Sequence, residues 1–136
     1  MIRYTEEREF TQKQVEELFL SVGWVSGKYP SHLHKALLNS PFVISAWDGG
    51  QLVGLIRGID DSCMTAFLHY LLVSPAYRRQ GIASRLVAMA KEHYRDFFYI
   101  NVMPEDSGNA PFYERHGFEL MPDGVAMQIC NHNFAH

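Results

Sequence analysis

The sequence is poor in cysteine and has no long apolar run. Cys63 and Cys130 are far apart and form no CxxC pair, so neither a disulfide framework nor a thiolate metal site is indicated. His132 and His136 are four residues apart, but no acidic or thiol partner accompanies them, and a frayed tail is the simpler interpretation. No apolar run approaches 18 residues and the start does not resemble a signal peptide. We therefore expect a cytoplasmic protein with no membrane contact and no metal.

The sequence also lacks a large excess of charge of either sign. Lys and Arg number 12 against 15 Asp and Glu, which gives a formal net charge of −3. Such a chain has no global basic field for nucleic acid, so any anion site must be local. The 136 residues, 47% of them hydrophobic, are typical of one globular domain spanning 1–136.

The first forty residues predict two helices. Apolar residues recur at helical spacing after Thr11, a candidate N-cap, and Gly23 follows as a stop. A second, shorter helix is predicted to open at Ser31 and to end before Pro41.

The remaining sequence alternates strand and helix patterns. Asp48-Gly49-Gly50 predicts a hairpin between two strands in "FVISAWDGGQLVGLIRGI", and the nearly continuous apolar run "MTAFLHYLLV" predicts a central third strand. "IASRLVAMAKEHYRDF" reads as an amphipathic helix and "FFYINVM" as a strand; "GNAPFYERHGF" reads as a short helix and "VAMQIC" as a last strand. This order predicts a mixed α/β sandwich with a strand–helix–strand unit at its centre.

The segment "VSPAYRRQGIASRLVAMA" joins the third strand to the long helix. A helix start offers unpaired backbone N–H groups, Gly81 lets an anion approach them, and Arg78 and Arg79 add positive charge. It matches neither a Walker loop nor a dinucleotide fingerprint. Taken alone, the segment fits a phosphate site or a polar turn with two solvated arginines.

Two motifs in order resemble the GCN5-related N-acetyltransferases (GNAT). "LLVSPAYRRQGIASRLV" is similar to the acyl-CoA motif [RQ]-x-x-G-x-[GA], with Arg78, Gly81 and Ala83 at its defining positions. "PFYERHGFEL" is similar to the later aromatic–glycine motif, through Tyr113 and Gly117–Phe118. The resemblance covers about residues 42–130, and the segments around both motifs look most similar to the arylalkylamine N-acetyltransferase branch.

The resemblance implies a single-domain α/β fold with a mixed, mostly antiparallel central sheet flanked by helices, and acetyl-CoA as co-substrate. Backbone amides from Arg79 to Ser84 would wrap the diphosphate, and the main chain of Leu71, Leu72 and Val73 would pair with the pantetheine arm. Asn109 is a weaker candidate, because Asp106 stands where many family members have asparagine in the same loop. The residues implied to contact the coenzyme are Leu71, Leu72, Val73, Arg78, Arg79, Gln80, Gly81, Ile82, Ala83, Ser84, Asn109 and Phe112.

The resemblance also supplies two catalytic candidates. Tyr113 would protonate the leaving thiolate; the alternative is a core aromatic residue whose hydroxyl reaches the surface. His69 would act as general base, directly or through water, because an ordinary imidazole pKa suits that role; the alternative is a structural histidine with a hydrogen-bond partner. Ideal alternation places His69 on one face of its strand with Phe67, Leu71 and Val73. The branch carries a second histidine where this chain has Phe67, which weakens a two-histidine relay.

The acceptor is the least determined part. A small primary amine, attacking directly in a ternary complex, is favoured by aromatic residues such as Trp24 in the N-terminal region, although these residues fit helix packing equally well. The alternatives are a protein or peptide acceptor, and a non-catalytic acyl-CoA-binding module. A homodimer is a further hypothesis, in which "VAMQIC" pairs across a two-fold axis.

Overall fold

A five-stranded sheet forms the centre of the molecule. The computed structural model describes residues 1–104 and 109–131. The strands follow one another in sequence order across the sheet, the first four are antiparallel, and the last pair is parallel. This arrangement confirms the mixed, mostly antiparallel α/β fold. The strands are β1 (Ile2–Thr5), β2 (Phe42–Asp48), β3 (Gln51–Asp60), β4 (Thr65–Val73) and β5 (Tyr99–Val102).

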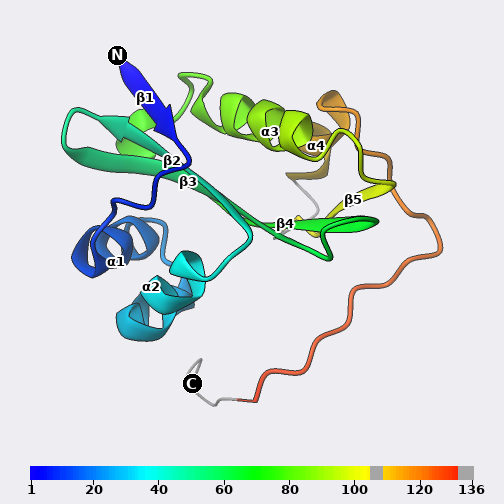
Figure 1. The fold of residues 1–136 in the computed structure, drawn as a ribbon, viewed down its shortest axis with the longest axis horizontal. Helices are drawn as coiled ribbons and strands as arrows, with labels where there is room; N and C mark the ends of the chain where they lie inside the picture. Colours follow the sequence, from blue (N-terminus) through cyan, green and yellow to red (C-terminus); the bar gives the residue numbers. More distant parts are fainter. Residues whose placement is uncertain (105–108, 132–136) are drawn as a thin grey trace.

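Helices cover both faces of the sheet (Figure 1). On one face lie α1 (Gln12–Ser21), the 3-10 helix η1 (Val25–Lys28) and α2 (Pro30–Leu38); α3 (Ile82–His93) crosses the other face, with the short α4 (Ala110–Arg115) near its end. A second 3-10 helix, η2 (Pro75–Tyr77), follows β4.

The two predicted helix starts have different outcomes. Thr11 caps α1 as predicted, since its hydroxyl accepts from the Gln14 amide at 3.1 Å while the Gln14 side chain accepts from the Thr11 amide. The prediction that Ser31 opens α2 is wrong by one residue. Pro30 occupies the first helical position, where its fixed φ favours the helix and its missing N–H costs nothing.

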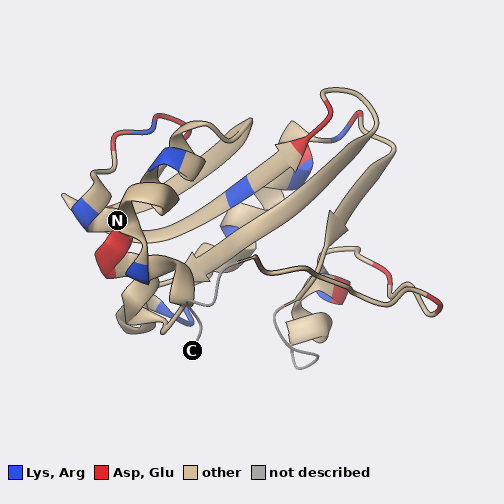
Figure 2. Cartoon of the chain, turned by 90° about the horizontal axis from the view of Figure 1, so that it is seen from below, with Lys and Arg blue, Asp and Glu red and all other residues tan. Residues whose placement is uncertain are grey.

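The apolar side chains form one cluster on each face of the sheet. The α3 face buries residues such as Ile56, Leu68 and Leu86, and the α1/α2 face buries residues such as Phe19 and Leu55. Figure 2 shows most of the strand length free of charged residues, which gather in the loops and helices. Burial on both faces explains why the strands read as continuous apolar runs.

A β-bulge in β4 corrects the predicted alternation. Leu55 pairs with Leu72 and Arg57 with His69, so two steps along β3 match three steps along β4. Tyr70 takes up the extra residue with φ +58°. Leu71 and Val73 consequently lie on the α3 face with Leu68, while Tyr70 and Leu72 pack against the α1/α2 cluster.

The pairing between β4 and β5 ends two residues before the bulge. These strands pair only from Thr65 with Tyr99 to Leu68 with Val102. Beyond Leu68, the side of β4 that faces β5 has no strand partner among the described residues.

The predicted last strand over "VAMQIC" is wrong. No strand is present between residues 118 and 131, and Val125, Met127 and Ile129 are 82%, 91% and 86% exposed. The alternating pattern makes this segment able to form a strand, but a strand requires hydrogen bonds from a partner edge, and β5 provides none to it here.

Candidate active site

The turn before α3 has the backbone geometry that an anion site requires. Arg79 and Gly81 both adopt left-handed conformations, with φ +64° and +80°, on either side of Gln80. Gly81 is the N-cap of α3, and a Cβ added to it would meet no heavy atom within 4 Å. The space in front of this backbone is therefore open.

Several amides in this turn have no acceptor. The first helical bond runs from the Arg85 N–H to the Gly81 carbonyl at 3.0 Å, which leaves the N–H groups of residues 82–84 unpaired. Residues 79–81 likewise donate no backbone hydrogen bond within the described chain. Arg78 and Arg79 are exposed beside them. Unpaired amides, a helix N-terminus and two cations together suit a diphosphate.

An imidazole at the C-terminal end of α4 reaches the same helix start. The Nε2 atom of His116 lies 3.2 Å from the Ser84 hydroxyl, and Lys91 donates to the His116 carbonyl at 2.5 Å. Burial lowers the pKa of His116, and the charges of Lys91 and Arg115 lower it further. Sequence reasoning missed this contact because 32 residues separate its partners and no local pattern links them.

A cavity of about 670 Å³ opens where β4 and β5 diverge. Its walls come from residues 68–71 of β4, from residues 102–104 at the end of β5, from the segment that includes Trp24, and from Asn109 and Tyr113. The cavity therefore brings together Tyr113, His69, Leu71 and Asn109, four of the residues singled out in the sequence.

Tyr113 lies on α4 with its ring half-buried. It meets Phe112 and Phe118 edge-on, at ring-centre distances of 5.1 and 5.7 Å. Burial raises its pKa above the ordinary value of 10. The phenol therefore keeps its proton at neutral pH, as a proton donor must.

His69 is held by a buried arginine. The Arg57 Nη2 atom lies 2.6 Å from His69 Nδ1, and the His69 ring stacks on Tyr70 with ring centres 4.0 Å apart. Burial, followed by the charge of Arg57, lowers the pKa of His69 to about 4. The premise of an ordinary pKa for His69 is therefore wrong, because a cation and an apolar wall both oppose its protonation.

Arg57 was not found in the sequence analysis. The available signal is a single cation inside the apolar strand segment "LVGLIRGI", where a charge requires partners. Its partner could not be identified without the register of β3 and β4.

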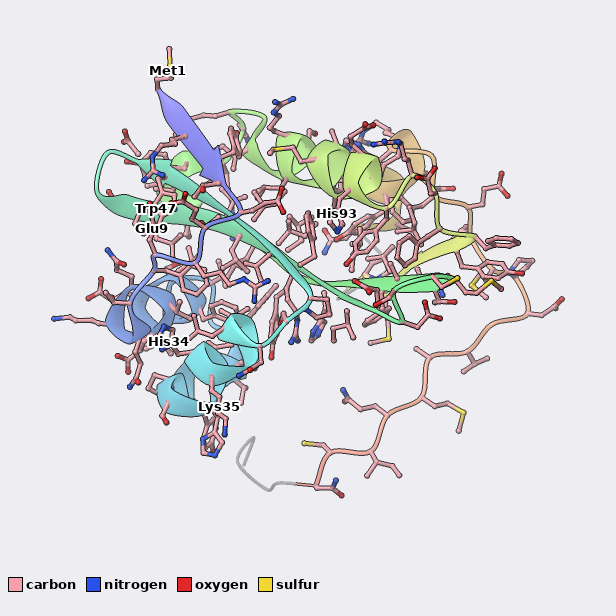
Figure 3. The ribbon with its side chains drawn as sticks, in the orientation of Figure 1. Met1, Glu9, His34, Lys35, Trp47 and His93 are labelled. Atoms are coloured by element: carbon pink, nitrogen blue, oxygen red, sulfur yellow. The ribbon has the colours of Figure 1, made fainter. Side chains whose placement is uncertain are left out.

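The other predicted site residues occupy different places. Phe112 packs against the α3-face cluster and Trp24 lines the cavity, whereas Asp106 lies outside the described residues. Figure 3 shows His93 on the α3 side of the sheet and His34 on α2; neither lines the cavity.

Two further features concern the described ranges 1–104 and 109–131. No group of three or more His, Cys, Asp or Glu in them could hold a metal ion. No helix there has the length and apolar character needed to cross a bilayer. His132 and His136 lie outside the described residues.

Comparison with known proteins gives concordant results. The sequence model of the Acetyltransferase (GNAT) family matches residues 5–118. An uncharacterized N-acetyltransferase, Ycf52, from Gracilaria tenuistipitata is 29% identical over 118 residues. That match covers 82% of this chain and 63% of the relative, so the chain corresponds to only part of the length of this curated protein.

Solved structures show the same architecture. A GNAT family acetyltransferase from Streptococcus pneumoniae superposes with a TM-score of 0.82 and 31% identity, covering 96% of this chain and 98% of its own. A probable acetyltransferase from meticillin-resistant Staphylococcus aureus gives a TM-score of 0.85 at 22% identity, covering 96% and 99%. The second likeness bears on the fold alone.

Proposed function

The chain belongs to the GNAT acetyltransferase family, and from this premise we propose that it transfers the acetyl group of acetyl-CoA to a primary amine of a small molecule. The observation that carries the proposal is the turn before α3, with its left-handed Arg79 and Gly81, unpaired amides and open space. The resemblance to the arylalkylamine branch stays a prediction.

The proposed coenzyme site combines two features: the turn between β4 and α3, and the edge of β4 that faces β5. The amides from Arg79 to Ser84, with Arg78 beside them, bind the diphosphate. The β5-facing edge of β4 at Leu71, Leu72 and Val73, which has no strand partner among the described residues, accepts the amide-bearing pantetheine arm as an added strand. The thioester then lies at the cavity, whose wall includes Leu71 and Tyr113.

The reaction needs no covalent enzyme intermediate. A neutral amine attacks the thioester carbonyl carbon, a carbon–nitrogen bond forms, and the carbon–sulfur bond breaks as the tetrahedral oxyanion collapses. Tyr113 gives its phenolic proton to the departing thiolate, and the proton lost by the amine passes to solvent and restores the phenol. The raised pKa of Tyr113 supports the first role, since the donor must be protonated beforehand.

In this proposal His69 belongs to the active site because it lines the cavity. Its Nδ1 lone pair faces Arg57, so a base role at neutral pH would require that contact to break. A base role through water would require the same break, because a bridging water also needs a free lone pair on the imidazole.

The cavity supports an acceptor with an apolar body. Its described lining residues include Trp24, Tyr70 and Leu71 but no Asp or Glu, and a multiply charged polyamine would find no counter-ion among them. A protein or peptide acceptor remains the second candidate, and a binding module without turnover the third.

Two measurements test the proposal. Isothermal titration should show acetyl-CoA binding, and free thiol should appear when small primary amines are added. Thiol release with peptides alone would favour the second candidate, and binding without release on any amine would favour the third. The absence of acetyl-CoA binding at high micromolar concentration would refute all three.

We also propose that the protein forms a homodimer through its exposed C-terminal segment. Val125, Met127 and Ile129 alternate along an extended chain, and the outer edge of β5 has no partner among the described strands. Light scattering should give twice the chain mass; a monomer at micromolar concentration would refute this arrangement.

A further inference from the structure

Arg57 is a buried cation without a carboxylate partner in the described chain. It lies in the middle of β3 with 9% of its surface exposed, and none of the described salt bridges includes it. Nη1 donates to the Ser40 hydroxyl at 3.3 Å, the guanidinium lies 4.5 Å from the centre of the Tyr70 ring, and Nε has no partner. Its shortest contact is the 2.6 Å hydrogen bond to His69.

That contact fixes the position of the imidazole proton. A guanidinium only donates hydrogen bonds, so His69 Nδ1 must be the acceptor and cannot carry a proton. A neutral imidazole with an unprotonated Nδ1 carries its proton on Nε2. A second proton on the ring would place two cations within 2.6 Å of each other in a buried site.

We propose that Arg57 is a positioning residue that holds His69 as the neutral Nε2–H tautomer, so that His69 presents a hydrogen-bond donor to the cavity between β4 and β5. His69 lines this cavity and Arg57 does not, so Arg57 acts only through the imidazole. A donor with a cation behind it favours an oxygen that carries or gains negative charge. This last step rests on the proposed function, in which a thioester carbonyl oxygen becomes an oxyanion in the same cavity.

The surroundings of His69 contain few other titratable groups. Arg57 faces it from β3, Tyr70 stacks on it from its own strand, and Tyr113 lies across the cavity on α4. The Phe67 ring, which does not titrate, also stacks near it, with ring centres 5.8 Å apart. No carboxylate is among the described lining residues, so nothing there opposes the effect of Arg57.

The test is a nitrogen NMR spectrum of the full chain labelled with 15N-histidine, with the His69 signals assigned from their loss in His69→Gln. The proposal predicts a protonated Nε2 and an unprotonated Nδ1 from pH 8 to pH 6, without titration in that range. Titration near 6.5 in the wild type, or a proton on Nδ1, would overturn it. This spectrum requires neither coenzyme nor turnover, so failure of the proposed function leaves the result interpretable.

Two variants separate the effect of Arg57 from general changes in the fold. In Arg57→Met the histidine should titrate about one unit or more higher than in the wild type, because a like charge has been removed. Arg85→Met is the matched control: its guanidinium lies over the Tyr4 ring at 5.9 Å and does not contact His69, so no shift is expected. An unchanged His69 titration in folded Arg57→Met would contradict the proposal; if that variant does not fold, the wild-type spectrum decides.

Kinetics give a further readout. With a small amine that supports turnover, the ratio of kcat/KM between Arg57→Met and the wild type should change with pH across the new histidine pKa. Ionisation of the amine affects both proteins equally and cancels in this ratio. A ratio independent of pH would show that Arg57 contributes packing alone, which would overturn its positioning role.

Discussion

Replacing Gly81 with alanine is the sharpest test of whether the turn before α3 binds the diphosphate of the coenzyme. Gly81 has φ +80°, where an L-residue costs about 1–2 kcal/mol. The new methyl group would meet no protein atom within 4 Å, so the loss of stability has a backbone origin only. For a chain of this size the melting temperature should fall by about 3–8 °C.

The same methyl group occupies the open space in front of the unpaired amides. If it displaces the diphosphate from one amide, a hydrogen bond to a charged group is lost, which costs about 1.5–3 kcal/mol. The dissociation constant for acetyl-CoA should then rise roughly 10- to 150-fold. Isothermal titration measures this change directly.

Gly49→Ala is the matched control. Gly49 also has a positive φ, +57°, and open space at its Cβ position, but it lies in the β2–β3 turn. It should lose comparable stability and keep its affinity for acetyl-CoA. If both variants bound acetyl-CoA as tightly as the wild type, the assignment of the diphosphate to this turn would be refuted. The same conclusion would follow if both variants lost affinity for acetyl-CoA to the same extent.

Three further predictions concern the acid, the core and pH. Tyr113→Phe should lower kcat about 10²- to 10⁴-fold with little change in acetyl-CoA affinity. Tyr99 is exposed and lies outside the cavity, so Tyr99→Phe should leave kcat unchanged. An unchanged kcat in Tyr113→Phe would remove Tyr113 as the acid. Gly58→Ala should destabilise the fold by about 1–3 kcal/mol in urea unfolding, because its Cβ would lie 2.5 Å from a buried tyrosine hydroxyl; Gly50→Ala has open space and should cost much less. His69 has a folded pKa of about 4, below its unfolded value of roughly 6.5, so the unfolded chain binds more protons between these values. The stability that His69 contributes is therefore present above pH 6.5 and is lost as pH falls towards 4. The unfolding free energy of the wild type minus that of His69→Gln should fall from pH 7 to pH 5. A constant difference would contradict the lowered pKa.

Local patterns predicted the parts of the site that depend on local chemistry. Gly81 was predicted to leave the strand-to-helix turn open to an anion, and a Cβ at this position would meet no heavy atom within 4 Å. Thr11 with Gln14 three residues later formed the capping box that such spacing predicts. In these cases the partners lie within a few residues of each other, so the sequence contains all the necessary information.

Features that depend on register could not be predicted. The bulge at Tyr70 adds one residue to β4 relative to β3, and no local signal distinguishes that residue from its apolar neighbours. One extra residue reverses every side chain that follows, which misplaced Leu71 and Leu72. The pairing of Arg57 with His69 depends on the same register.

The sheet edge with which a segment pairs also cannot be predicted from the sequence of that segment. The segment 125–130 has the alternation of a strand, yet alternation indicates only that a strand could form there. Whether the strand forms depends on whether a sheet edge is free to pair with it, in the same chain or in a second copy. The local sequence pattern carries no information about such an edge. Conversely β1, with only four residues, is too short for periodicity to reveal, and it forms because β2 pairs with it.

A crystal structure of the protein with acetyl-CoA would test the central claim most directly. The account predicts the diphosphate against the amides of residues 79–84, and the thioester in the cavity between Leu71 and Tyr113. A coenzyme bound elsewhere, or side chains packed into that turn and cavity in its presence, would contradict the account.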